Sequence, residues 1–251
     1  MPKVWFDEQV AAGYDEHSPE MFDPAVLGPT VDFLADLAGR AGLAGGGSAL
    51  ELGIGTGRVA LPLSRRGVRV HGIDLSAPMV ERLRAKPGGA AIDVTVGDFA
   101  TTTVDGTFDL AYLVFNTITN LTTQDEQVAC FRNVAAQLEP GGLFVIEVGV
   151  PILQRLPPGE VFRTFHHDAR HLGFDEYDVA TQLMYSHHYR FGENGTYERF
   201  SVPFRYVWPA ELDLMARLAG MRLRERWADW SRAPFTSESR SHVSVWELPP
   251  A

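Results

Sequence analysis

A glycine-rich turn between a short apolar segment and a predicted helix is the feature that most limits what this chain can fold into and bind. Residues 49–58 read Ala-Leu-Glu-Leu-Gly-Ile-Gly-Thr-Gly-Arg. Gly53, Gly55 and Gly57 allow the backbone to adopt positive φ and to approach a ligand with no Cβ in between. The helix predicted over residues 57–66 directs its unpaired N–H groups toward the same space. The segment therefore predicts a strand, a ligand-binding turn and a helix.

The spacing of the glycines and two charged neighbours narrow the class of ligand. A dinucleotide-binding turn has the spacing Gly-x-Gly-x-x-Gly and holds a pyrophosphate. Here the spacing is Gly-x-Gly-x-Gly, and Arg58 occupies the position of the third dinucleotide glycine. Glu51, two residues before the first glycine, would repel a pyrophosphate but would suit an ammonium group. We therefore expect a cationic or zwitterionic cofactor, and an NAD-dependent oxidoreductase is the less favoured alternative.

This acid-x-Gly-x-Gly-x-Gly turn resembles the first motif of the class I S-adenosylmethionine-dependent methyltransferases. The resemblance implies that S-adenosyl-L-methionine is the cofactor. It also implies that Arg58 approaches the methionine carboxylate and that the whole turn contacts the cofactor, through Glu51, Gly53, Gly55, Gly57 and Arg58. The resemblance is specific over about residues 45–150.

The acid at the end of the second predicted strand is placed to bind the hydroxyl groups of a ribose. The strand covers residues 68–73 and ends at Asp74, which lies 74 − 53 = 21 residues after the first glycine. That is about the separation at which such an acid meets a ribose diol. An ionised carboxylate accepts two hydroxyl hydrogen bonds at once. We therefore place Asp74 in the cofactor site, together with Leu75 and Met79.

Two later strands end in residues that the same family places near the cofactor. A strand predicted over residues 92–96 leads to Asp98 and Phe99. The resemblance implies that the Asp98 carboxylate accepts a hydrogen bond from the adenine amine and that Phe99 lies on the ring face. A strand predicted over residues 108–114 opens into a loop that begins with Phe115. In the family this loop presents the methyl group to its acceptor.

The N-terminal region supplies one more candidate. Residues 11–15 read Ala-Ala-Gly-Tyr-Asp, and they resemble the segment of small-molecule methyltransferases in which a tyrosine closes over the cofactor. We therefore include Tyr14 among the cofactor-binding residues. A helix predicted over residues 2–12 ends near this run, and a stronger one is predicted over residues 24–40.

Strands and helices alternate from residue 49 to residue 148, and this pattern favours a parallel sheet with helices on both faces. We expect an α/β fold with a Rossmann-like, mostly parallel seven-stranded sheet, whose last strand is antiparallel as the resemblance implies. After the glycine turn the predicted elements are strands 68–73, 92–96, 108–114, 143–148, 221–230 and 241–248 and helices 57–66, 76–86, 123–137 and 209–219.

We interpret residues 1–251 as one methyltransferase domain with four parts. Residues 1–45 form an N-terminal helical lid, and residues 46–150 form the cofactor-binding core. Residues 151–208 form an inserted segment that caps the substrate, and residues 209–251 complete the sheet.

The inserted segment holds the candidate catalytic residue. Residues 151–180 have no regular pattern, whereas residues 181–191 and 196–208 predict a β-hairpin lid around a glycine-rich turn. Alternate residues of a strand share a face, so His187 shares one with the aromatic residues of its strand. If that face lines the acceptor pocket, His187 is the candidate general base. The alternative is a histidine bonded to a neighbour in the sheet.

Composition excludes several classes of partner. The 32 acidic and 22 basic side chains give a net charge of −10, which argues against a nucleic-acid partner. No segment approaches the roughly 20 apolar residues of a membrane helix, and no secretory signal is visible. The single cysteine, Cys130, excludes an intrachain disulfide and fits the reducing cytoplasm. We expect a cytoplasmic monomer or homodimer without membrane contact and, for lack of a carboxylate cluster after the fourth strand, without a metal.

Together these features predict a methyltransferase that acts on a small-molecule acceptor, such as a natural product, by in-line displacement. The acceptor atom is left open among oxygen, nitrogen and carbon. A non-catalytic module that binds the same cofactor is the alternative from another class, because it would keep the glycine turn and Asp74.

Overall fold

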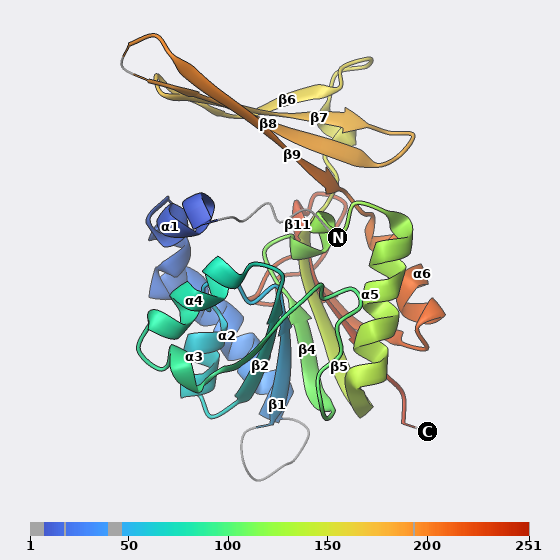
Figure 1. Ribbon diagram of the computed structural model, residues 1–251. Coiled ribbons are helices and arrows are strands. Elements are labelled where there is room, and N and C mark those ends of the chain that lie inside the picture. The colour runs from blue at the N-terminus through green and yellow to red at the C-terminus, as the bar shows by residue number, and fades with distance from the viewer. Residues whose placement is uncertain (1–7, 18, 40–46, 193, 251) are drawn as a thin grey trace.

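A seven-stranded sheet forms the centre of the molecule (Figure 1). The computed structural model describes residues 8–17, 19–39, 47–192 and 194–250. The strand order is β10-β11-β5-β4-β1-β2-β3. The strands are β1 (Ser48–Leu52), β2 (Arg69–Asp74), β3 (Asp93–Val96), β4 (Phe108–Leu113), β5 (Leu138–Gly149), β10 (Arg222–Trp227) and β11 (Ser241–Glu247).

The direction of the strands confirms the predicted fold. The central strand β1 runs parallel to β2 and β4, and β3 and β5 continue the parallel pairing outward. Only β11 is antiparallel to both of its neighbours, β5 and β10. Every residue of β1 and β4 is buried, because helices cover both faces of a parallel sheet. The carboxyl ends of β1, β2 and β4 therefore meet at one edge, where ligands of such sheets bind.

Helices cover the two faces in separate groups. Figure 1 shows α2 (Pro24–Gly39), α3 (Ala60–Arg65) and α4 (Ala77–Ala85) on one side of the sheet. It shows α5 (Gln124–Gln137) and α6 (Pro209–Leu218) on the other side. A hydrophobic core lies on each face of the sheet, and neighbouring residues of β5 pack into different cores. Val145 packs with α2 and α3, and Ile146 packs with α5 and α6. This alternation follows from the two-residue period of a strand.

A second sheet lies across the carboxyl end of the first one (Figure 1). It has the order β6-β7-β8-β9 and is antiparallel throughout. The predicted hairpin is confirmed as β8 (Leu183–Phe191) and β9 (Tyr197–Arg205). The prediction that residues 151–180 are irregular is wrong, because they contain β6 (Phe162–His167) and β7 (His171–Asp178). All eight residues of β7 pair with β8, so pairing with the hairpin rather than a local signal makes this segment a strand.

Three predicted boundaries are wrong for local reasons. The first helix does not end near Gly13, since α1 covers Glu8–His17; the earlier part of that prediction lies outside the described residues. The helix after the glycine turn begins at Ala60, because Gly57 has a positive φ of 79° that no helix accepts. The strand predicted over residues 143–148 begins earlier, at Leu138, and its first part is irregular where it pairs with β4. Among the residues that the structure describes, no helix is long and apolar enough to cross a membrane.

Candidate active site

The glycine turn is tied to the end of β2 by hydrogen bonds. The N–H groups of Gly53 and Ile54 donate to the Ile73 carbonyl at 2.8 and 3.2 Å. The Gly55 N–H donates to Asp74 Oδ2 at 2.7 Å, and the Ser76 N–H donates to Asp74 Oδ1 at 2.8 Å. Burial raises the pKa of Asp74, and these N–H groups oppose that rise by stabilising the carboxylate. Asp74 therefore lies against the glycine turn, as the sequence predicts.

Two glycines of the turn are required by the packing around them. Gly53 has a φ of +73°, and a Cβ there would lie 2.7 Å from Thr117 Cγ2. Gly57 has a φ of +79°, and a Cβ there would lie 2.7 Å from Leu83 Cδ1. Only glycine adopts such a φ at low cost. Met79 is also close, since its Cε lies 3.6 Å from the Cβ position of Gly55.

Glu51 lies beneath the turn rather than on its open side. Its side chain is 2% exposed, and Oε2 accepts a hydrogen bond from Tyr112 Oη at 2.9 Å. The Ala60 N–H at the start of α3 stabilises the same carboxylate, and the positive charge of Arg58 acts in the same direction. Burial outweighs both and raises the pKa of Glu51 to about 8. At neutral pH Glu51 is therefore mostly protonated, and it affects the turn through the position of α3.

The loop after β4 faces the turn through one side-chain pair. The Arg58 guanidinium lies 5.4 Å from the centroid of the Phe115 ring, a cation–π distance. Phe115 is 49% exposed, and both Phe115 and Asn116 have positive φ, 57° and 60°. This backbone is held from β5, because the Phe115 N–H donates to Glu147 Oε2 at 2.9 Å. Two successive strained residues at a binding edge are typical of functional loops.

Helix α1 brings Tyr14 to the same place. Burial raises the pKa of Tyr14, the Arg58 charge lowers it, and the charges of Asp74 and Asp15 raise it further. Tyr14 therefore stands within the electrostatic reach of both Arg58 and Asp74. The structure brings together Tyr14, Glu51, Arg58 and Asp74, which are spread over 61 residues of sequence, since 74 − 14 + 1 = 61.

Two polar residues that the sequence did not single out, together with Asp15, hold α1 in this position. Thr56 Oγ1 donates to Asp15 Oδ1 at 2.6 Å, and Lys86 forms an ion pair with Asp15. Lys86 Nζ also donates to the Thr56 carbonyl at 2.8 Å. We call Asp15, Thr56 and Lys86 the α1 clamp. Lys86 follows the last residue of α4, and no motif marks it in the sequence.

Asp98 and Phe99 follow β3, which lies beside β2 in the sheet. The Gly97 N–H donates to the Asp74 carbonyl at 2.9 Å, so the residue directly before Asp98 is hydrogen-bonded to Asp74. Its carboxylate accepts from the Ala100 N–H at 2.9 Å. The Phe99 side chain is 9% exposed and packs in the core on the α5 side. Contact of either residue with an adenine stays a prediction, as does that of the half-buried Leu75.

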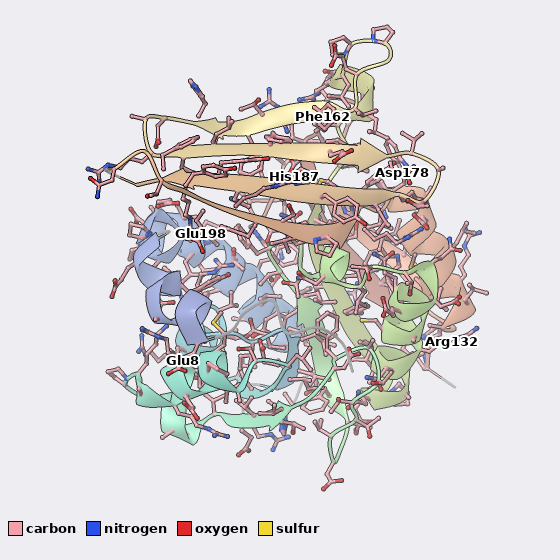
Figure 2. All side chains as sticks on the ribbon, turned by 45° about the horizontal axis from the view of Figure 1, so that its top comes forward. Glu8, Arg132, Phe162, Asp178, His187 and Glu198 are labelled. Atoms are coloured by element: carbon pink, nitrogen blue, oxygen red, sulfur yellow. The ribbon has the colours of Figure 1, made fainter. Side chains whose placement is uncertain are left out.

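His187 lies apart from the turn, on the second sheet. Figure 2 shows it on β8, in the sheet that covers the top of the molecule. It is 8% exposed, and both ring nitrogens have partners. Nδ1 lies 2.7 Å from Ser201 Oγ, and Nε2 lies 3.0 Å from Glu176 Oε2. Its role as a base stays a prediction, and the structure adds Ser201 and Glu176 as its partners.

Comparisons with known proteins agree with this site. A family model described as a methyltransferase domain matches residues 49–142, which run from β1 into β5. The chain is 30% identical over 250 residues to cypemycin N-terminal methyltransferase of a Streptomyces species. That match covers 93% of this chain and 97% of the relative.

Two solved structures are similar over most of the chain. The CcbJ methyltransferase from Streptomyces caelestis has a TM-score of 0.77 and 39% sequence identity, over 89% of each chain. S-adenosylmethionine-bound CalS10 is an amino pentose methyltransferase from Micromonospora echinaspora involved in calicheamicin biosynthesis. It has a TM-score of 0.68 and 21% identity over 99% of each chain, which shows a shared fold.

These matches favour the methyltransferase interpretation of the glycine turn over the dehydrogenase one. They include a relative that is 30% identical across almost the whole of both chains, and they agree with the position of Asp74 against the turn. The chain therefore belongs to the class I S-adenosylmethionine-dependent methyltransferases.

Proposed function

We propose that this enzyme methylates an amine nitrogen of a small-molecule acceptor held between the glycine turn and the second sheet. The observation that carries the proposal is the arrangement of a cofactor turn, with Asp74 against it, beneath a separate sheet that covers its open end (Figure 1). Nitrogen is supported by the names of two similar proteins, an N-terminal methyltransferase and an amino pentose methyltransferase.

The residues of the turn fit the cofactor. The Asp74 carboxylate has about four acceptor positions, and backbone N–H groups of Gly55, Leu75 and Ser76 use three of them. We propose that a ribose hydroxyl donates to the position left. Arg58 and Tyr14 would hold the methionine carboxylate. The ammonium group of the same zwitterion would lower the pKa of Glu51 and would be favoured by the ionised carboxylate that forms.

We assign the cofactor-binding role to the residues of the turn and of the neighbouring strand ends. Asp98 would accept from the adenine amine, and Phe115 would cover the methyl-transfer side. When bound, S-adenosylmethionine supplies a methyl group on a sulfonium that leaves as a neutral thioether, so the main task of the protein is to position the acceptor in line. The full set is Tyr14, Glu51, Gly53, Gly55, Gly57, Arg58, Asp74, Leu75, Met79, Asp98, Phe99 and Phe115.

An amine reaches an enzyme at neutral pH mostly as ammonium, so it must lose a proton before it can attack. We propose that His187 takes this proton. In the tautomer with the proton on Nε2, that nitrogen donates to Glu176 and Nδ1 accepts from Ser201 Oγ. Ser201 would then accept from the acceptor ammonium while its own proton passes to Nδ1. Glu176 favours the imidazolium that forms.

The lid roles follow from the same proposal. The N-terminal part, residues 1–45, would close the cofactor site through Tyr14 and the α1 clamp. Residues 151–208 would cap the acceptor, and residues 209–251 complete the sheet with β10 and β11.

Product analysis with matched acceptors tests the proposal. A panel of amino sugars and short peptides is offered together with the analogues in which a hydroxyl replaces each amine. We expect at least one amine to gain one methyl group, with an equal amount of S-adenosylhomocysteine, and its hydroxyl analogue to gain none. Methylation of hydroxyl analogues but of no amine would overturn the nitrogen assignment.

A further inference from the structure

A cavity opens beside the glycine turn. It has a volume of about 410 Å³ and lies between α2 and α3. Its apolar wall includes Phe22, Leu27, Val31 and Leu61. It shares Gly57 and Arg58 with the turn, but Gly53, Gly55, Asp74 and Asp98 do not line it. We call it the α2–α3 groove, and it adjoins the proposed cofactor site, with which it shares Gly57 and Arg58.

The side chains that line the groove carry an excess of positive charge. Four of its lining residues are basic and one is acidic, in a protein whose net charge is −10. Lys86 is paired with Asp15, and Arg66 is paired with Asp32 at 2.5 Å. Within the part of the chain that the structure describes, Arg58 and Arg65 have no carboxylate at ion-pair distance.

The two arginines without a carboxylate partner both line the groove. Arg65 belongs to α3, and its single hydrogen bond to the Pro87 carbonyl is long, at 3.4 Å. Arg58 stands just before α3 and contacts the Phe115 ring. The groove therefore combines an apolar wall with two cationic groups that suit an anion.

A glycine in α2 keeps the groove open. Gly28 lines the groove, and a Cβ built on it meets no atom within 4 Å. Gly28 and Pro29 lie inside α2, where both residue types weaken a helix. No close neighbour requires a glycine at this position, so its effect is to leave volume free. This observation is independent of the charges.

We propose that the α2–α3 groove binds a small amphipathic carboxylate, with the charge at Arg65, because Arg58 is assigned to the methionine carboxylate, and with the apolar end against Leu27 and Val31. This function lies beyond methyl transfer. Because Arg58 lines the groove and is also assigned to the cofactor, occupancy of the groove changes the affinity for the cofactor, and the reverse effect is equally large.

Titration calorimetry with octanoate tests the proposal. Octanol, which has the same chain length but no charge, is the control ligand. Both titrations are carried out in saturating S-adenosylhomocysteine, so that the cofactor site is filled. We expect octanoate to bind at least about tenfold more tightly than octanol, because a charge-assisted hydrogen bond is lost with the carboxylate. Arg65→Gln should remove most of that difference. Equal binding of the two ligands, no binding of octanoate, or complete displacement of octanoate by S-adenosylhomocysteine would overturn the proposal.

Two glycine variants of the same helix locate the site. Gly28→Leu places a side chain in the groove and should weaken octanoate binding at least about tenfold, since it removes the volume for the apolar end. Gly39→Leu is the control, because Gly39 is also in α2 and has no atom within 4 Å of its Cβ position but does not line the groove. Both replace a helix glycine with a better helix former, so both should fold. Equal affinity of the two variants would place the binding elsewhere and overturn the proposal.

Discussion

The Asp74 carboxylate accepts a hydrogen bond from the Gly55 N–H at 2.7 Å. This single contact joins the acid after β2 to the turn after β1. The same carboxylate also accepts hydrogen bonds from the first backbone N–H groups after β2, those of Leu75 and Ser76. It therefore shapes the turn and leaves one acceptor position, the one that we propose for a ribose hydroxyl.

Asp74→Asn should weaken S-adenosylmethionine binding by about 10- to 100-fold, because a hydrogen bond to a charged group is worth about 1.5–3 kcal/mol. The amide also turns an N–H₂ group toward backbone donors. Titration calorimetry measures the effect. Asp93→Asn is the matched control, since Asp93 is an exposed acid on the neighbouring strand β3. Equal dissociation constants for the two variants would remove Asp74 from the cofactor site.

Gly53→Ala should destabilise the fold by more than about 1–2 kcal/mol, the cost of a left-handed residue other than glycine. Its Cβ would also lie 2.7 Å from Thr117 Cγ2. Gly67→Ala measures the cost of the left-handed backbone alone, because Gly67 has a φ of +86° and no atom within 4 Å of its Cβ position. Urea unfolding compares the free energies of unfolding of the Gly53→Ala and Gly67→Ala variants.

Adding Thr117→Ser removes Thr117 Cγ2 and should recover the difference between the Gly53 and Gly67 variants. If Gly53→Ala costs no more than Gly67→Ala, the close approach of the two loops does not contribute to stability.

Lys86→Gln should weaken S-adenosylmethionine binding about two- to fivefold, because it releases α1 and with it Tyr14. The side chains of Lys86 and Asp15 are each 25% exposed, and ion pairs near the surface contribute up to about 1 kcal/mol. Asp15→Asn and the double variant complete a double-mutant cycle. Additive losses in calorimetry would contradict a clamp in which the two residues act together.

The raised pKa of Glu51 predicts a fall in stability as pH increases. The native state holds a proton up to about pH 8, whereas the unfolded chain releases it near the ordinary value of 4.5. Between these values the native state binds more protons, so the free energy of unfolding falls by at most about 1.4 kcal/mol per pH unit. Urea unfolding of the ligand-free protein should show this fall from about pH 5 to about pH 8. Glu51→Gln should show a shallower fall, and parallel curves for the two proteins would refute the assignment.

His187→Gln should lower kcat by about 100-fold or more, the usual contribution of a general base, without changing the affinity for S-adenosylmethionine. Turnover of the variant should recover at high pH, where the acceptor amine is already neutral. Ser201→Ala should follow the same pattern. Ser186→Ala is the control, because Ser186 is next to His187 on β8 but bonds Asp175. Full turnover of His187→Gln at neutral pH would leave His187 as a structural residue of the sheet.

The glycine turn and the succession of strands and helices over residues 49–148 could be predicted from local signals. Gly53 and Gly57 need positive φ, and only one residue type supplies it cheaply, so the turn is visible in the sequence. Asp74 is visible for a related reason, since it ends a buried strand at a fixed distance from the turn. The antiparallel last strand came from the family resemblance and is confirmed by the pairing of β11 with β5.

The second sheet shows the opposite case. Every residue of β6 is exposed, so burial left no two-residue pattern in its sequence. Its hydrogen bonds come from β7, and those of β7 come from β8. A strand whose structure depends on a partner cannot be recognised from its own residues.

The sequence by itself determined the class of cofactor, the mostly parallel sheet and the residues at the ends of β1, β2 and β4, because backbone conformation and burial constrain the residue at each of those positions. Only the tertiary structure decided that Lys86 holds α1, that His187 bonds Ser201 and Glu176, and that Glu51 is buried with a raised pKa. Those properties depend on distances between side chains far apart in the chain and on their removal from water, and neither is encoded by a local pattern.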